Sequence, residues 1–133
     1  MSVETSEAEW IRLAEMDIAT SHHMFETYHP KPLEVVCFHA QQAAEKMLKC
    51  FLVSKDSEIP KIHDLRVLCE RCIEYDTNFS DIYEPSIMLT RYGVVPRYPT
   101  ELRISEQNAK KAIEDAETVM SFIKELFSDN TAT

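Results

Sequence analysis

The chain has 133 residues and a formal net charge of −9, with 44% hydrophobic and 28% charged residues. This length suits one domain with a single core, and the composition excludes a chain that is disordered throughout. The acidic charge argues against general DNA binding, because phosphates require a basic surface. No apolar run approaches the roughly 20 residues that span a bilayer, and the N-terminus does not resemble a signal peptide, so we expect a cytoplasmic protein with no membrane partner.

Glycine and proline usage predicts an all-α domain. The only glycine is Gly93, whereas a β-rich domain of this size needs several glycines in tight hairpins. The prolines lie between long stretches that contain neither residue, as breaks between helices do. The first stretch, about 6–28, places apolar residues on one broad face. The second, about 33–54, repeats them at spacings of three and four, which is a helical pattern.

The middle of the chain predicts two shorter helices. The third helix should start near His63 or Asp64, because either residue can cap it. The fourth should cover about 81–91 and begin or be interrupted near Pro85, since proline removes a backbone donor.

A last helix is predicted from Ser105, as N-cap, to about 127. We therefore expect a single domain over 1–133, built as an up-and-down bundle of four to five helices. Residues 128–133 are expected to form a frayed tail.

The cysteines and histidines predict no metal site. Cys37, Cys50, Cys69 and Cys72 lie among apolar neighbours on predicted helices, as reduced and buried thiols do. Cys69 and Cys72 form a C-x-x-C pair, but a zinc site needs about four ligands and no second such pair exists.

A second metal candidate is the segment of His22, Glu26 and His29. Glu-x-x-His is half of the di-iron motif of helical bundles, yet the chain has no second copy and Pro30 follows at once. A single glycine also excludes a glycine-rich phosphate loop. We expect neither a metal nor a cofactor.

Charge is unevenly distributed along the chain. Both ends are acidic, whereas residues 31–111 are neutral overall. Within the segment 91–103, one glutamate stands against three arginines, Arg91, Arg97 and Arg103. A local positive site on an acidic body suits a small anion better than a polymer. The sequence leaves open the alternative that these arginines pair with the acidic helices.

The second predicted helix has a polar stripe formed by His39, Gln42, Lys46 and Lys49, at steps of three, four and three. As a functional surface, Lys46 and Lys49 would meet phosphate while Gln42 fixes orientation. As a structural feature, the stripe would be an ordinary solvated face. His63 has a similar pair of interpretations, as a catalyst or as a capping residue at the start of a helix.

Three stretches together resemble the HEPN family (higher eukaryotes and prokaryotes nucleotide-binding domain): Gln42-Ala43-Ala44-Glu45-Lys46 with Lys49 downstream, His63-Asp64-Leu65, and Arg97-Tyr98-Pro99. The resemblance covers nearly the whole chain. It implies an up-and-down helical bundle that is commonly dimeric, with nucleotide or RNA binding in many members. It also implies a minimal nucleotidyltransferase as a frequent partner.

One subset of that family consists of ribonucleases, whose hallmark is Arg, four to six residues, then His. No histidine follows any arginine of this chain at that spacing. Arg103 and Asn108 have the spacing, but asparagine cannot transfer a proton near neutral pH. Enzymatic activity is therefore not expected, and a ribonuclease toxin with an unorthodox site is kept as an alternative.

The leading hypothesis is a non-catalytic HEPN-like module that binds a nucleotide or an anionic partner group as a homodimer. The arginines would hold phosphate and the tyrosine would stack on a base. The binding candidates are Arg91, Arg97, Tyr98, Lys46, Lys49 and Gln42, followed by His63, Lys61 and Arg103. A pure protein-interaction module, for instance the partner of a nucleotidyltransferase, is the main alternative.

Overall fold

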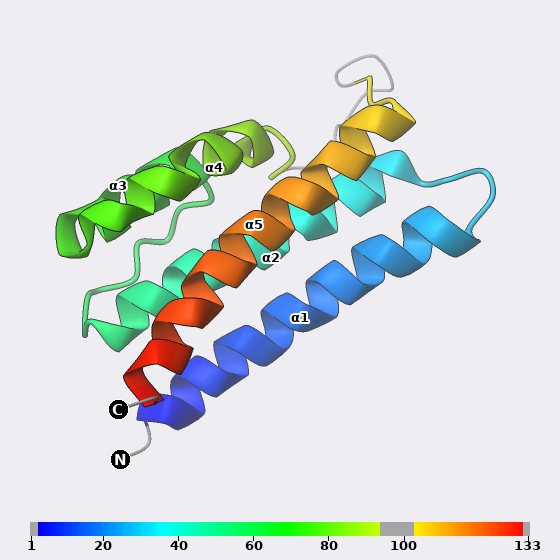
Figure 1. Cartoon of the computed structure of the whole chain (residues 1–133). Coiled ribbons are helices and arrows are strands. Elements are labelled where there is room, and N and C mark those ends of the chain that lie inside the picture. The colour runs from blue at the N-terminus through cyan, green and yellow to red at the C-terminus, as the bar shows by residue number, and fades with distance from the viewer. Residues whose placement is uncertain (1–2, 94–102, 132–133) are drawn as a thin grey trace.

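The computed structural model describes residues 3–93 and 103–131, and over these residues every element is a helix (Figure 1). In chain order the elements are α1 (Val3–Thr27), α2 (Leu33–Ser54), α3 (Leu65–Tyr75), the 3-10 helix η1 (Thr77–Ile82), α4 (Tyr83–Thr90) and α5 (Glu106–Thr131). The predicted all-α fold class is confirmed. The long helices α1, α2 and α5 lie side by side, while α3 and α4 form a second layer.

Helix α2 is the centre of the bundle, because it contacts α1, α3, α4 and α5. Thirteen of its 22 residues are buried, so its buried surface is wider than one apolar stripe. Three of these buried residues are polar or charged: Gln41, Glu45 and Lys49. Buried polar groups require partners, so the core around α2 must contain a hydrogen-bonded network.

Small side chains line the contacts between the three long helices. Alanines allow helix axes to approach closely, because they add little to the distance between the backbones. The fully or almost fully buried alanines are Ala14 on α1, Ala40, Ala43 and Ala44 on α2, and Ala109, Ala112 and Ala116 on α5. On the side of the second layer, Phe79 packs between Phe51 and Phe122, with ring centroids 4.4 and 5.0 Å away.

Local hydrogen bonds explain where two of the helices begin. The Asp64 carboxylate accepts a hydrogen bond from the backbone N–H of Arg66 at 2.9 Å, so Asp64 caps α3. Before α5, the Ser105 hydroxyl accepts from the N–H of Asn108, and the Asn108 side chain accepts from the N–H of Ser105, both at 3.0 Å. This reciprocal arrangement is a capping box, and it confirms Ser105 as the predicted start signal.

Two boundaries differ from the sequence-based expectation. Instead of one helix over 81–91, the 3-10 helix η1 runs to Ile82 and α4 begins at Tyr83. Pro85 therefore lies in the first turn of α4, where its missing N–H costs no helical hydrogen bond. At the other end, α5 continues to Thr131, four residues beyond the predicted 127.

The cysteines are buried and unpaired, as predicted. Burial raises the pKa of Cys37 and Cys50 to about 12 and that of Cys69 to about 11. Burial raises the pKa of the Cys72 thiol as well. All four therefore remain thiols at neutral pH rather than reactive thiolates.

Candidate functional site

The polar stripe of α2 is covered by neighbouring parts of the chain. Asp17 of α1 reaches it from one side: His39 Nδ1 lies 2.8 Å from Asp17 Oδ1, and the Lys46 ammonium donates to Asp17 Oδ2. One carboxylate thus holds two residues of the stripe and ties α1 to α2. We call Asp17, His39 and Lys46 the first polar cluster.

The second polar cluster is formed by Gln41, Glu45, Lys49 and His63. Glu45 Oε2 accepts from Lys49 Nζ at 3.0 Å and from His63 Nδ1 at 2.8 Å, while Glu45 Oε1 accepts from Gln41 Nε2 at 3.1 Å. Burial raises the pKa of Glu45, but the hydrogen bonds from His63, Lys49 and Gln41 outweigh it, and the pKa is lowered. Glu45 is therefore ionised although it is only 5% exposed.

His63 is the exposed member of this cluster, since 68% of its side chain is accessible. A carboxylate only accepts hydrogen bonds, so Nδ1 carries the proton in the bond to Glu45. In the neutral ring, Nε2 is then an acceptor. The sequence leaves His63 as a helix cap or a catalyst, but Asp64 caps α3 and His63 is oriented by a buried carboxylate.

The end of α4 is attached to the second polar cluster. The Thr90 hydroxyl accepts from the backbone N–H of Leu65 at 2.9 Å. Gly93 lies so close to Gln41 that a Cβ on the glycine would stand 3.3 Å from Gln41 Nε2. The same Nε2 donates to the His63 carbonyl at 3.2 Å. Gly93, the last described residue before position 103, therefore lies beside the second polar cluster.

Arg91 directly follows the end of α4 and lies beside a small pocket between α4 and α5. The pocket has a volume of about 50 Å³ and is lined by Met88, Arg91, Tyr92, Asn108, Lys111, Ala112 and Asp115. The Arg91 guanidinium lies 5.3 Å from the centroid of the Tyr92 ring, a cation–π contact. Within the described part of the chain, Arg91 has no ion pair.

Lys111 and Asp115 bring opposite charges to the same pocket. Lys111 Nζ donates to Asp115 at 2.5 Å, and this bond raises the pKa of Lys111. Asp115 is almost fully buried, whereas Lys111 is exposed. The charged side chains that line the pocket, Arg91, Lys111 and Asp115, sum to one positive unit, while Glu84 and Glu114 lie near Lys111. A small anion fits that balance better than a polyanion.

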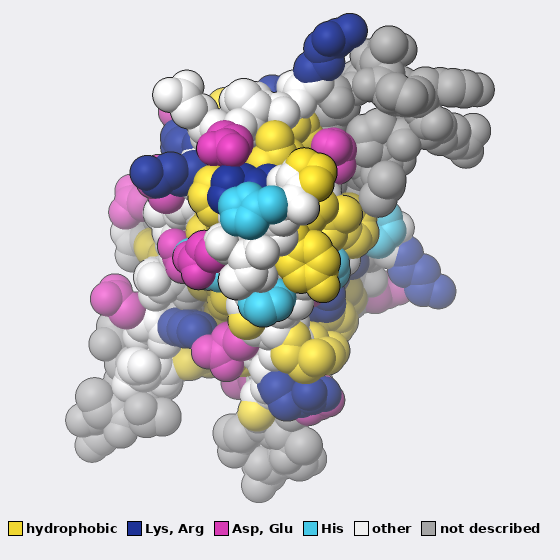
Figure 2. Space-filling model, turned by 90° about the vertical axis from the view of Figure 1, so that its right-hand side faces the viewer, with side chains coloured by type: hydrophobic (Ala, Val, Ile, Leu, Met, Phe, Trp, Pro, Cys, Tyr) yellow, Lys and Arg dark blue, Asp and Glu magenta, His cyan; other side chains and the backbone are white. Residues whose placement is uncertain are grey.

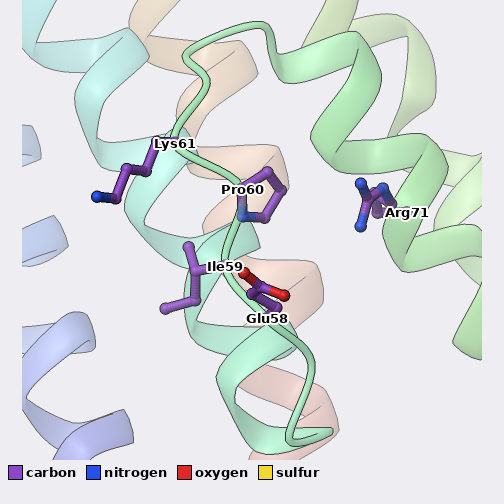
Figure 3. Close-up of a pocket in the computed structure, with 5 residues that line it drawn as sticks. All are labelled: Glu58, Ile59, Pro60, Lys61 and Arg71. Atoms are coloured by element: carbon purple, nitrogen blue, oxygen red, sulfur yellow. The ribbon is translucent and has the colours of Figure 1, made fainter.

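The remaining predicted residues are dispersed. Arg97 and Tyr98 lie outside the described residues. Arg103 is exposed before α5. Lys61 lines a separate pocket of about 320 Å³ between the α2–α3 link and α3, together with Glu58, Ile59, Pro60 and Arg71 (Figure 3).

The stripe is not the ordinary solvated face that was one of the two alternatives drawn from the sequence. Lys49 is only 8% exposed and bonded to Glu45, so it is not on a solvated face. Lys46 is likewise neutralised by Asp17. Gln42 donates to the Gln41 side chain at 2.8 Å. Both lysines are therefore engaged within the chain before any ligand arrives.

The metal candidate on α1 is occupied by other contacts. His22 Nε2 lies 2.8 Å from Glu117 of α5, and its Nδ1 lies 3.5 Å from Glu26. The two carboxylates are thus on opposite sides of the ring, and His29 lies beyond the end of α1. Over residues 3–93 and 103–131, no group of three or more histidine, cysteine or acidic side chains is arranged to hold a metal. In the same residues, no helix is long and apolar enough to cross a membrane.

The fold and these clusters define a helical bundle whose central helix has a buried, ion-paired polar face. The sequence profile of the HEPN domain matches residues 8–126. The chain therefore belongs to the HEPN domain family, as the resemblance in the sequence predicted. A comparison with curated proteins gives no match.

Solved structures with the same fold include two proteins of low sequence identity. The crystal structure of TT1696 from Thermus thermophilus is similar with a TM-score of 0.75 and 21% identity, over 90% of this chain and 96% of that one. ST0689, described as an archaeal HEPN homologue, gives a TM-score of 0.70 and 23% identity over the same shares. At such identities the similarity shows the fold alone.

Proposed function

We propose that this chain is a non-catalytic HEPN module that binds the phosphate group of a nucleotide, or an anionic group of a partner, where α4 meets α5. The observation that carries this proposal is the state of Arg91. Its guanidinium is exposed, has no ion pair with a described residue, and stands beside a pocket that Asn108 and Lys111 also line. An arginine in this state can bind phosphate with two parallel hydrogen bonds.

The surroundings of Arg91 support a nucleotide rather than phosphate alone. Met88 and Ile87 on α4 are exposed by 45% and 38%, and Met88 lines the same pocket. Apolar surface of this kind can cover a base or a ribose, which phosphate alone does not need. In this proposal Arg97, Tyr98 and Arg103 add charge and a stacking ring, while Lys46 and Lys49 stabilise α2 without contacting the ligand.

Calorimetric titration with ATP tests the proposal. We expect a dissociation constant on the order of 100 μM, or about 5.5 kcal/mol, because few contacts are available and the protein is acidic. Arg91→Ala should weaken binding at least about tenfold, the loss of about 1.4 kcal/mol or more. Arg97→Ala should do the same if the proposed role of that residue holds.

Lys124→Ala is the matched control, because Lys124 pairs with an exposed acid, Glu15, elsewhere on the bundle. It should bind ATP as the unaltered chain does. No binding of millimolar ATP by the intact protein would end the nucleotide proposal. It would leave the interaction module as the better account.

A second candidate function, protein interaction, is favoured by a separate surface. The face in Figure 2 lies over the link between α1 and α2, and hydrophobic and histidine side chains gather on it. Tyr28 and Val35 in this region are 51% and 37% exposed. We propose that a protein covers it, either a second copy of this chain or a nucleotidyltransferase. Light scattering tests the homodimer, and a mass near 15.4 kDa would contradict it.

A further inference from the structure

The pocket between the α2–α3 link and α3 has no role in the function proposed above. Its volume of about 320 Å³ lies at the lower end of the range of small-molecule sites, about 300–1,000 Å³. Residues Glu58 to Lys61 form one wall and Arg71 of α3 forms the other. The pocket therefore has room for one small molecule.

Two opposite charges line this pocket without neutralising each other. Arg71 and Glu58 are both exposed, and neither forms an ion pair with any described residue. Glu74 follows Arg71 by three residues on α3, a spacing at which side chains of a helix can form an ion pair. Arg71 forms no such ion pair with Glu74. Arg66 on the same helix, by contrast, pairs with Glu70 at 3.0 Å.

Figure 3 shows how these side chains are directed. Arg71 from α3 and Glu58 from the link turn toward the same gap, and the Pro60 ring lies on that side of the link. Lys61 and Ile59 extend from the opposite side of the link, away from Arg71. On the side of the link that faces Arg71, the pocket thus presents one cation, one anion and a rigid apolar ring, while Ile59 and Lys61 complete its lining.

We propose that this pocket binds a small zwitterion, of which a free α-amino acid is the simplest kind, with its carboxylate on Arg71 and its ammonium group on Glu58. The planar guanidinium matches a carboxylate with two parallel hydrogen bonds. Glu58 accepts hydrogen bonds only, so it suits an ammonium donor. An apolar side chain of the ligand would contact Pro60.

A simple anion fits this pocket less well. Glu58 would face an anion bound by Arg71 and repel it, and Lys61 is directed away from the gap. A simple cation bound by Glu58 would likewise be repelled by Arg71. A ligand with both charges is attracted by both walls of the pocket. The site is separate from the Arg91 pocket, and the proposal does not depend on nucleotide binding.

Amide chemical-shift titration of the isotopically labelled chain with L-leucine tests the proposal. We expect a saturable response at millimolar ligand, confined to residues 58–61 and the part of α3 around Arg71. N-acetyl-L-leucine lacks the cation and L-leucinamide lacks the anion. Each should bind at least about fivefold more weakly than L-leucine, because one charged contact is lost.

Two variants remove the same charges from the protein that the two analogues lack in the ligand's partner contacts: Glu58→Gln and Arg71→Gln. Glu58→Gln should weaken L-leucine binding and, because the negative charge that repels an anion on Arg71 is gone, strengthen the binding of N-acetyl-L-leucine until the two ligands bind alike. Arg71→Gln should do the same with respect to L-leucinamide. Because both side chains are exposed, neither variant should lower the melting temperature appreciably. Lys110→Gln, which removes an exposed positive charge of α5 outside the pocket, is the matched control and should bind L-leucine normally.

Several outcomes would overturn the proposal. One is the absence of a saturable response, and another is equal binding of all three ligands, which would show that the charges are not used. Inorganic phosphate provides a further test. If it shifts the same amides at lower concentration than L-leucine, the pocket is an anion site instead.

Discussion

The lysines of α2 and the arginine at the end of α4 have the same formal charge and opposite surroundings. Lys46 and Lys49 are covered by α1 and by the residues around His63, and each is matched by a carboxylate. Arg91 is exposed, and an aromatic ring rather than an acid lies next to its guanidinium. The positive charges of α2 are therefore paired with carboxylates, and the Lys46–Asp17 pair joins α2 to α1, whereas Arg91 is exposed and has no ion pair with a described residue.

This difference indicates which basic residues are free to bind a ligand. A buried ion pair must be broken before either partner can bind something else, and the remaining charge would then be buried and unmatched. An exposed arginine loses only its hydration when a phosphate arrives. Functional and structural roles of the basic residues should accordingly separate in experiments that measure stability and binding on the same variants.

The largest expected effect is that of Glu45→Ala. Removing this carboxylate leaves the Lys49 ammonium buried without a counter-ion and deprives His63 and Gln41 of their acceptor. We expect the free energy of unfolding to fall by about 3–5 kcal/mol, measured by urea denaturation. Glu74→Ala, which removes an exposed acid of α3, should change it by less than about 0.5 kcal/mol. Equal effects of the two changes would show that the second polar cluster is not structural.

The same cluster should make the protein sensitive to acid. The pKa of Glu45 is lowered in the folded state, so its contribution to stability is present above its unfolded pKa of about 4.3 and is lost as the pH falls through the folded value. The stability difference between the unaltered chain and Glu45→Gln should therefore narrow below about pH 4. A stability difference between the two proteins that stays constant down to the lowest pH tested would contradict this explanation.

A smaller effect is expected for Lys46→Met, in the first polar cluster. Its pair with Asp17 is partly exposed, so the loss should be about 1 kcal/mol, between the values of exposed and buried pairs. ATP binding should not change. Arg91→Ala should show the reverse result, with weakened binding and a stability change below about 0.5 kcal/mol. Thermal melts and titrations of both variants provide the check, and a loss of binding in Lys46→Met would remove the distinction between the two regions.

The smallest effect concerns His22, which joins α1 to Glu117 of α5. The hydrogen bond that the His22 ring donates to the Glu117 carboxylate raises the pKa of His22, despite the opposing effect of burial. Stability from this pair is thus fully present below the unfolded pKa of about 6.5 and is lost as the pH rises through the higher folded value. Because the pair is half exposed, His22→Gln should cost about 0.5 kcal/mol at low pH and nothing at alkaline pH. Urea denaturation at several pH values measures it.

The fold could be predicted from local signals because most of its boundaries depend on neighbouring residues. Pro32 precedes α2, and the predicted range 33–54 agrees with the structure. Asp64 and Ser105 cap their helices through bonds to residues two and three positions away. The 3-10 helix was not predicted, because the contact that fixes it is distant: Phe79 is buried between Phe51 and Phe122.

The polar clusters were predicted only in part, for a similar reason. The Glu45–Lys49 ion pair joins residues four positions apart on one helix, so it can be predicted from the sequence. The pairing of Lys46 with Asp17 joins two helices, and nothing in the sequence shows which acid of α1 faces α2. Helical spacing points to Gln42, although the adjacent Gln41 is the residue that bonds Glu45 and the His63 carbonyl. A shift of one residue turns a helix by about 100°, which separates these two roles.

The four buried thiols described above can be used to measure how often each layer of the bundle opens. A thiol reagent reacts with thiolate at an accessible sulfur, so each cysteine can be modified only while the bundle around it is open. Cys37 and Cys50 sample the central helix, whereas Cys69 and Cys72 sample α3 in the second layer. If α3 separates from the bundle more often than α2 is exposed, its two cysteines will be labelled first under native conditions. The order of labelling therefore reports which layer opens, without any added probe.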